Sequence, residues 1–131
     1  MEHRTEIKVR GYHLDLYGHV NNARYLEFLE EARWRMVEKG SSLESWRRRG
    51  LAFVIVKIAI NYRRGAVLDD VLTIESRLAR LGGRSGVIAQ DVKRGEEMVA
   101  DAEVTFVVMD MATGSAVGIE GAVREELESL G

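Results

Sequence analysis

Apolar and polar positions alternate along three stretches of the chain, which predicts half-buried strands because successive side chains of a strand point to opposite faces. These stretches are residues 4–12, 71–81 and 98–109. Gly82-Gly83 forms a turn after the second stretch, so residues 85–93 are expected to return as a further strand. Residues 51–60 are almost continuously apolar, which predicts a strand buried on both faces, and a last short strand is expected near Val117.

One long helix is predicted over residues 22–39, a stretch that contains no glycine and is followed by Gly40. Its apolar residues recur at three- and four-residue spacing and form one stripe, while charged residues lie on the other side. The stripe consists of Tyr25, Leu29, Ala32 and Met36, and the charged side of Glu27, Glu31 and Arg35. Asn22 is the expected N-cap and Gly40 the expected C-cap, because Asn and Gly favour these positions.

Two shorter helices are expected later in the chain. The first begins at Ser41 or Ser42, either of which can cap it, and extends through Arg49. The second lies at the end of the sequence, where three apolar residues have helical spacing: Val123, Leu127 and Leu130. The order is therefore one strand, one long helix and four or five strands joined by tight turns, which predicts an α+β fold with a mostly antiparallel sheet. Because one helix covers only one sheet face, we expect oligomerisation to cover remaining apolar surface.

Composition and charge narrow the class of protein. The 131 residues predict one domain, residues 1–131, and 46% hydrophobic with 31% charged residues is typical of a globular chain. A net charge of -2 with interspersed signs argues against nucleic-acid binding. No window is apolar enough to span a membrane, and five of the first ten residues are charged, unlike a secretory signal, so a cytoplasmic protein is expected. With no cysteine and no metal-ligand spacing among the three histidines, we expect no disulfide, metal or cofactor.

The reactive side chains of the N-terminal half are concentrated between residues 12 and 25, where the first strand leads into the long helix. Asp15 can act there as a nucleophile or as a general base for water. Free backbone N–H groups at the start of the helix can stabilise an oxyanion, because they have no partner within the helix and carry partial positive charge. A carboxylate beside such donors suits acyl transfer.

This turn resembles that of the hotdog-fold acyl-CoA thioesterases of the 4-hydroxybenzoyl-CoA type. In the branch that the chain resembles, the pattern is Asp-x-x-Gly-His-Val-Asn-Asn-x-x-Tyr-Leu, and every position matches. The matching residues are Asp15, Gly18, His19, Val20, Asn21, Asn22, Tyr25 and Leu26, followed by Glu30-Glu31-Ala32-Arg33. The similarity continues in residues 60–63, 82–85 and 102–108. The chain departs from the family at Asp69-Asp70, where many members have Gly-Asp, and at residues 119–121, where many have a proline.

The resemblance implies a hotdog fold, in which a five- or six-stranded antiparallel sheet wraps a long central helix. It also implies hydrolysis of an acyl-CoA to free acid and CoA, by a homodimer or a tetramer of paired dimers with active sites at the subunit interface. Asp15 matches the catalytic carboxylate of the family, and Gly18 matches the glycine that lets the backbone approach the thioester. The N–H groups at the helix start match the oxyanion donors.

Other residues of the site have structural alternatives. His19 is a candidate base, although it can equally brace the turn, and Asn22 is a helix cap that can also hold water or the carbonyl. In this fold the catalytic carboxylate can also lie on the long helix, so Glu27, Glu30 and Glu31 are candidates to share or replace the role of Asp15. For Glu27 and Glu31, which form a stripe with Arg35, a solvated helix face is the ordinary explanation. The candidate substrate-binding residues are Val20, Tyr25 and, for the CoA phosphates, Arg63, Arg64 and Arg84.

Two other functions are compatible with the same fold. A non-hydrolytic acyl-CoA or acyl-carrier binding module would keep the pocket without turnover. A hotdog-fold dehydratase or hydratase would need an acid–base pair, such as His19 with a helix glutamate, although the turn does not resemble that branch. Thiol release from CoA thioesters separates hydrolysis from binding alone.

Overall fold

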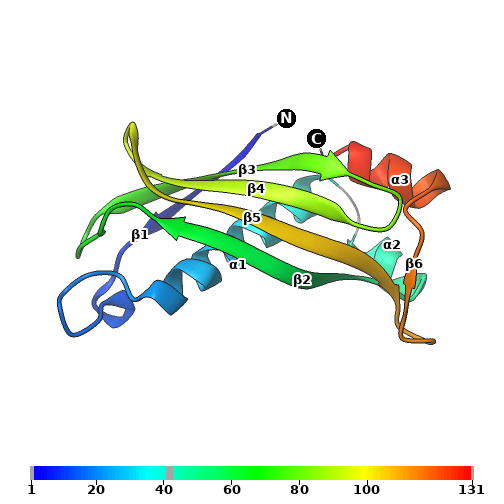
Figure 1. Cartoon of the computed structure of the whole chain (residues 1–131), viewed down its shortest axis with the longest axis horizontal. Helices are drawn as coiled ribbons and strands as arrows, with labels where there is room; N and C mark the ends of the chain where they lie inside the picture. The colour runs from blue at the N-terminus through cyan, green and yellow to red at the C-terminus, as the bar shows by residue number, and fades with distance from the viewer. Residues whose placement is uncertain (1, 41–42, 131) are drawn as a thin grey trace.

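The computed structural model describes residues 2–40 and 43–130, and Figure 1 shows how their helices and strands are arranged. The strands are β1 (His3–Lys8), β2 (Leu51–Tyr62), β3 (Val71–Leu81), β4 (Gly86–Arg94), β5 (Glu97–Asp110) and β6 (Ser115–Val117). The helices are α1 (Asn22–Gly40), α2 (Leu43–Arg48) and α3 (Gly121–Glu128), with a 3₁₀ turn at Gly11–His13.

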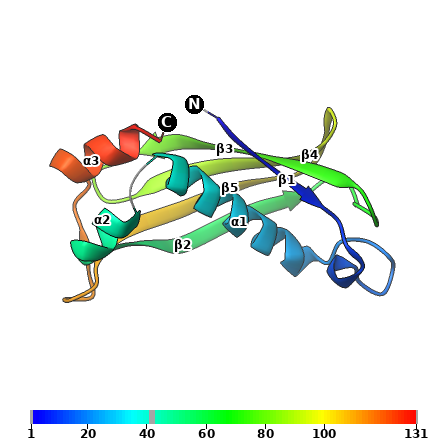
Figure 2. The same ribbon diagram turned by 180° about the vertical axis from the view of Figure 1, so that it is seen from behind.

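The strands form one antiparallel sheet in the order β1-β3-β4-β5-β2, with the short β6 paired to β5. Helix α1 lies across one face of this sheet, as Figure 2 shows from behind. The arrangement confirms the predicted fold class, a long helix wrapped by a six-stranded antiparallel sheet. No helix in the described ranges 2–40 and 43–130 is long and apolar enough to cross a membrane.

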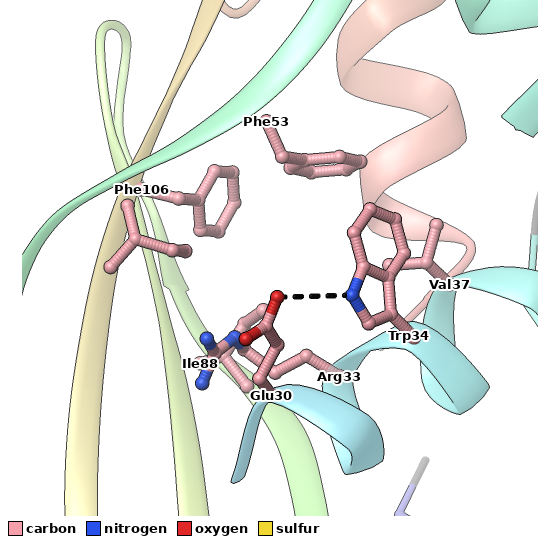
Figure 3. A pocket seen from close by; sticks show the side chains of 8 residues that line it. Glu30, Arg33, Trp34, Val37, Phe53, Ile88 and Phe106 are labelled. Carbon is pink, nitrogen blue, oxygen red and sulfur yellow. Dashed lines mark hydrogen bonds between the residues drawn. The ribbon is translucent and has the colours of Figure 1, made fainter. Parts of the chain in front are cut away.

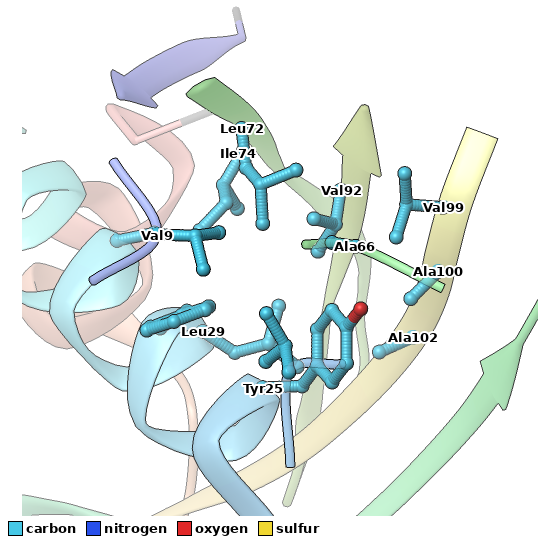
Figure 4. Close-up of a cluster of buried hydrophobic side chains, with 13 residues drawn as sticks. Val9, Tyr25, Leu29, Ala66, Leu72, Ile74, Val92, Val99, Ala100 and Ala102 are labelled. Atoms are coloured by element: carbon cyan, nitrogen blue, oxygen red, sulfur yellow. The ribbon is translucent and has the colours of Figure 1, made fainter. Parts of the chain in front are cut away.

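The core lies between α1 and the sheet. All four residues of the predicted helix stripe are buried, and so are the five alternate residues of β5 from Ala100 to Val108 that were predicted to share a face. Figure 4 shows part of this core, in which Leu29 and Tyr25 of α1 face Val92 of β4 and Ala100 of β5. Burial of these side chains is what holds the helix on the sheet, since each fully buried aliphatic side chain contributes about 1.5–3 kcal/mol.

Strand β2 corrects one prediction. Residues 51–60 were expected to be buried on both faces, but β2 is an edge strand whose single strand partner among the described residues is β5. Ile55 and Val56 remain 37% and 56% exposed, where the register with β5 shifts between Ile55 and Lys57. The prediction was wrong because a continuous apolar run reports what a strand can bury, and not whether another strand of the same chain covers it.

Two helix and strand boundaries also differ from the prediction. Strand β1 ends at Lys8 instead of continuing to residue 12, because the chain turns into the 3₁₀ segment after Val9. Helix α1 is capped by Asn21 instead of Asn22: the Asn21 side-chain oxygen accepts a hydrogen bond from the Ala23 N–H at 2.8 Å. The proposed capping residues Ser41 and Ser42 lie outside the described residues.

The end of the sheet near α2 and α3 is closed by apolar packing. The ring of Trp46 stacks on that of Phe53, with 4.7 Å between the centroids and an interplanar angle of 11°. Phe53 in turn meets Phe106 edge to face, and Leu127 and Leu130 from the C-terminal segment are fully buried in the same cluster. The apolar residues that were predicted to share one face of the last helix, Val123, Leu127 and Leu130, therefore pack into this cluster.

Candidate active site

The segment before α1 is a closed loop built around Asp15. One carboxylate oxygen of Asp15 accepts hydrogen bonds from the Tyr17 N–H at 2.9 Å and the His19 N–H at 3.2 Å. The Asp15 backbone also bonds to Gly18 and His19, and Gly18 has a φ of 79°, in the left-handed region that glycine adopts without a steric penalty. Asp15 therefore caps the turn, as Asp commonly does, and it uses only its Oδ1 atom for this.

The loop is held to the rest of the chain on both sides. The Asn21 N–H donates to the His13 carbonyl at 2.9 Å, and the Val20 N–H donates to the Ala66 carbonyl at 2.9 Å. The buried His13 ring accepts the Arg10 N–H on Nδ1 at 2.8 Å. Burial, followed by the positive charge of Arg24, lowers the pKa of His13, which keeps the ring neutral and able to accept.

The start of α1 leaves a backbone donor for a ligand. Asn21 takes up the N–H groups of Ala23, through its side chain, and of Arg24, through its carbonyl. The Asn22 N–H has no hydrogen-bond acceptor in the described part of the chain, whereas the Asn22 carbonyl accepts the Tyr62 hydroxyl at 2.8 Å. A ligand that approaches this end meets the Asn22 N–H together with the positive end of the helix dipole.

A pocket of about 580 Å³ opens at this point, between the turn and the chain that leaves β2. Its lining brings together six of the residues that the sequence marked as catalytic or substrate-binding. Those six are Asp15, Val20, Asn22, Tyr25, Arg63 and Arg64, and the lining is completed by Tyr62 and Gly65. Residues from two distant parts of the sequence thus surround one space, with a carboxylate and two guanidinium groups at its wall.

Tyr25 contributes a buried hydroxyl to this pocket wall. The side chain is 3% exposed and its hydroxyl makes no hydrogen bond of normal geometry within the described residues. Burial raises the pKa of the hydroxyl, and the nearby Ala66 backbone opposes this to a smaller degree. Buried polar groups without partners are uncommon in proteins, and they mark places where a ligand or water completes the hydrogen bonding.

The other predicted site residues lie outside this lining. Gly18 and His19 belong to the loop, and the His19 ring covers Gly65, where an added Cβ would come within 2.8 Å of His19 Cδ2. Glu31 is on the exposed side of α1 and pairs with Arg35 at 2.9 Å. Arg84 lies in the β3–β4 turn, at the opposite end of the sheet from the Asp15 loop in Figure 1.

A second pocket, apolar and about 140 Å³ in volume, lies between α1 and the sheet next to the β2 edge. Figure 3 shows Trp34, Phe53 and Phe106 around it, with Glu30 accepting the Trp34 Nε1–H at 3.3 Å. Arg33 reaches the buried Gln90, to whose Oε1 it donates at 3.1 Å, and burial lowers the pKa of the Arg33 guanidinium. Of the three helix glutamates considered from the sequence, Glu30 is the one that lines this pocket.

Sequence reasoning missed the second pocket. Its helix residues have i, i+4 spacing, Glu30 with Trp34 and Arg33 with Val37, beside the stripe that was recognised. That spacing was a usable signal. The sheet residues opposite come from β2, β4 and β5 and have no common sequence pattern. Among residues 2–40 and 43–130, no three His, Asp or Glu side chains gather in a way that could hold a metal ion.

A long helix wrapped by an antiparallel sheet, with a polar pocket at the helix start and an apolar pocket between later turns of the helix and the sheet, is the architecture of a hotdog-fold protein. Comparison with known sequences agrees: residues 9–127 match the model of the thioesterase-like superfamily. The chain belongs to this superfamily. The family resemblance of the turn is thereby confirmed.

Individual relatives are similar over nearly their whole length. The long-chain acyl-CoA thioesterase FadM of Escherichia coli (strain K12) is 54% identical over 129 residues, which are 97% of this chain and 98% of the relative. The acyl-CoA thioesterase YbgC of Haemophilus influenzae is 29% identical over 93% of each chain. The crystal structure of YbaW, a probable thioesterase from Escherichia coli, superposes with a TM-score of 0.93, at 53% identity and 98% coverage of both chains.

Proposed function

We propose that this protein hydrolyses acyl-CoA thioesters to the free acid and CoA, in the pocket at the start of α1. The observation that carries the proposal is that Asp15 lines the same pocket as Asn22, whose N–H has no acceptor in the described part of the chain. The similarity to FadM and YbgC, both acyl-CoA thioesterases by name, supports the same reaction.

Asp15 supplies the base or the nucleophile. Two backbone N–H groups bind its Oδ1 and fix the carboxylate, so that Oδ2 is available for the reaction. As a general base, Asp15 takes a proton from water, and the hydroxide attacks the thioester carbonyl; as a nucleophile, it attacks the carbonyl itself and forms an anhydride that water then cleaves. In both routes the C–S bond breaks and the CoA sulfur leaves and becomes protonated.

The Asn22 N–H serves as the oxyanion donor in this proposal. When the carbonyl carbon becomes tetrahedral, its oxygen becomes negative, and a fixed donor at the positive end of a helix stabilises that charge without rearrangement. Loss of one such donor typically costs about 3 kcal/mol of transition-state stabilisation. The Arg24 N–H binds the Asn21 carbonyl and so holds the peptide unit that carries the Asn22 N–H. The Tyr62 hydroxyl and the Asn21 side chain hold the next peptide unit, through the Asn22 carbonyl and the Ala23 N–H.

The rest of the substrate is assigned by charge and polarity. Arg63 and Arg64 line the pocket and suit the phosphates of CoA, although each also has an acidic partner, Asp101 and Glu97 respectively. Arg84 lies at the far end of the sheet, so its role toward CoA would need another subunit. The apolar pocket beside Trp34 suits the acyl chain, and the name of FadM as a long-chain enzyme supports an apolar chain.

A second copy of the chain is expected along the exposed β2 edge. An antiparallel two-fold pairing centred on the middle of β2 would place the Phe53 end of one copy beside the Ile60 end of the other. The apolar pocket of one subunit would then lie next to the Asp15 loop of its partner, so that one substrate touches both subunits. The molecular mass in solution distinguishes a monomer, a dimer and a tetramer of paired dimers.

The decisive experiment compares Asp15→Asn with Asp110→Asn on a panel of CoA thioesters. Asp110 is a matched control, because its Oδ1 also accepts two backbone N–H groups, those of Ala112 and Thr113, but at the other end of the sheet. We expect Asp15→Asn to lower kcat by about 100-fold or more and Asp110→Asn to leave it within about 2-fold. Wild-type turnover in Asp15→Asn would exclude the catalytic role of Asp15. Saturable acyl-CoA binding by the wild type without thiol release would instead identify a binding module.

A further inference from the structure

The wall of the active-site pocket opposite Asp15 is the connection between β2 and β3, residues 63–70. Two contacts tie the catalytic turn to it: the Val20 N–H donates to the Ala66 carbonyl at 2.9 Å, and the His19 ring covers Gly65. Ala66 is fully buried, so its carbonyl cannot shift without disturbing the core. The position of the turn relative to the sheet therefore depends on where Gly65 and Ala66 are held.

Arg94 and Asp70 hold these two residues. Nη1 of Arg94 donates to the Gly65 carbonyl at 3.0 Å and to Asp70 Oδ2 at 2.8 Å. The same Asp70 oxygen accepts the Val67 N–H at 2.9 Å, so the peptides on both sides of Ala66 are fixed by one ion pair. The pair is partly shielded from solvent, with side chains 32% and 20% exposed.

Both members of the pair have further partners that favour their charged forms. The Val67 N–H, followed by Arg94, lowers the pKa of Asp70, and bonds to Glu97 and Asp70 raise the pKa of Arg94. Glu97 also lies 3.4 Å from Arg64, which lines the pocket. A lysine in place of Arg94 would not reproduce the arrangement, because an ammonium group lacks the planar fork that serves three acceptors at once.

We propose that Asp70 and Arg94 are positioning residues for the thioesterase site. Neither lines the pocket; they act through the Ala66–Val20 hydrogen bond, which holds the turn that carries Asp15 and Asn22 in place against the opposite pocket wall. The inference rests on the proposed function. A displacement of about 1 Å at a reacting group can reduce the rate about 100-fold. The Asp70–Arg94 pair therefore affects turnover although it does not contact the substrate.

The test uses three variants of the full-length protein. Asp70→Ala removes the acceptor of both Val67 and Arg94, and Asp70→Asn keeps a side-chain oxygen at the same place. Asp91→Ala is the matched control, because Asp91 also pairs with an arginine, Arg77 at 3.6 Å, and its side chain is 24% exposed, close to that of Asp70. The measurements are kcat and KM for a CoA thioester, well below the unfolding temperature, and hydrogen exchange of the Val20 N–H.

We expect Asp70→Ala to lower kcat by about 10- to 100-fold with KM within about 3-fold, and to accelerate exchange of the Val20 N–H about 10-fold or more. Asp70→Asn restores kcat to within about 3-fold of the wild type, and Asp91→Ala leaves both readouts unchanged. A merely structural role would accelerate exchange throughout β4 and leave kcat of the folded protein intact.

Two results would overturn the proposal: kcat of Asp70→Ala within about 2-fold of the wild type, or unaltered exchange at Val20. The exchange measurement does not depend on catalysis. If the wild type releases no thiol while Asp70→Ala still accelerates exchange at Val20 alone, the support of the turn stands and the proposed thioesterase function fails.

Discussion

The two ends of the sheet are built in different ways. At the end with the candidate active site, the turn before α1 is held by hydrogen bonds, and its large side chains point outward: Tyr12, Leu16 and Tyr17 are 70%, 91% and 79% exposed. At the other end, α2, β6 and α3 close over buried apolar side chains such as Trp46 and Leu127. One end is fixed by directional bonds and the other by burial.

We expect the two ends to contribute differently: apolar burial mainly to the free energy of unfolding, and hydrogen bonds mainly to the positions of particular atoms. Apolar burial contributes free energy roughly in proportion to the area removed from water and fixes no particular atom, whereas a hydrogen bond contributes little net free energy but fixes two atoms within a few tenths of an ångström. Changes at the α2–α3 end to residues that do not line the apolar pocket should therefore reduce the free energy of unfolding and spare turnover. Changes at the turn should reduce turnover and have little effect on the free energy of unfolding.

The largest effect on stability is expected for Trp46→Ala. Trp46 is 2% exposed, stacks on Phe53 and donates its Nε1–H to Glu126, so truncation opens a cavity and removes a hydrogen bond. We expect the free energy of unfolding to fall by about 3–5 kcal/mol, with kcat per folded molecule within about 2-fold of the wild type. Urea titration and kinetics at low temperature measure the two. A large loss of kcat in the folded variant would show that the two ends are coupled.

The sequence predicted the packed parts of the fold better than its edges. Alternation along 98–109 identified the buried face of β5 correctly, because the strands that pair with β5, namely β2, β4 and β6, all belong to the same chain. The same reasoning misjudged residues 51–60, because the exposure of β2 depends on its lying at the edge of the sheet, which a local pattern does not report. Asn21 and Asn22 have the same capping propensity, and only the backbone geometry decides between them.

The sequence offered the clearest signal for the part of the candidate site whose residues are close together in the chain. Asp15 and Asn22 lie within eight positions, so a turn brings them together in any fold that starts a helix there. Arg94 reaches Gly65 and Asp70 across separations of 29 and 24 residues, for which the sequence carries no periodic signal. Only the strand order, which places the end of β4 beside the β2–β3 connection, reveals this contact.

Acid should weaken the turn more than the α2–α3 end. The pKa of His13 is lowered in the folded protein, so the unfolded chain takes up a proton near the ordinary value of 6.5 while the folded ring resists. Stability from His13 is therefore fully present above about pH 6.5 and is lost as the pH falls toward the folded pKa. Protonation removes the Nδ1 acceptor of the Arg10 N–H, a hydrogen bond whose usual net contribution is about 1 kcal/mol.

The variant His13→Asn isolates this contribution, because its side-chain oxygen can accept the Arg10 N–H without titrating. The groups that act on the ring are Arg24, Glu27 and Arg10, and all three remain in the variant. Urea titrations at pH 7.5 and 5.5 should show a smaller loss of stability in His13→Asn than in the wild type. An equal loss in both proteins would mean that other groups cause the acid sensitivity.

The smallest effect concerns Asp69, where many family members have glycine. Its φ of 70° lies in the left-handed region, and it is the third residue of a tight turn closed by the Asp70 N–H and the Val67 carbonyl at 3.1 Å. Asp69→Gly relieves the steric cost of this conformation, while the exposed pair with Lys8 that it removes, at 3.9 Å, contributes little.

We expect Asp69→Gly to raise the free energy of unfolding by about 0.5 kcal/mol and Asp69→Val to lower it by about 1–2 kcal/mol, because a β-branched side chain crowds the backbone most at positive φ. Both should keep kcat within about 2-fold if the ion pair of Asp70 with Arg94 alone positions the connection. Thermal unfolding and kinetics of the two variants check this. A valine variant as stable as the wild type would show that the turn can relax, and the strict geometry inferred for the active-site end would then not extend to this residue.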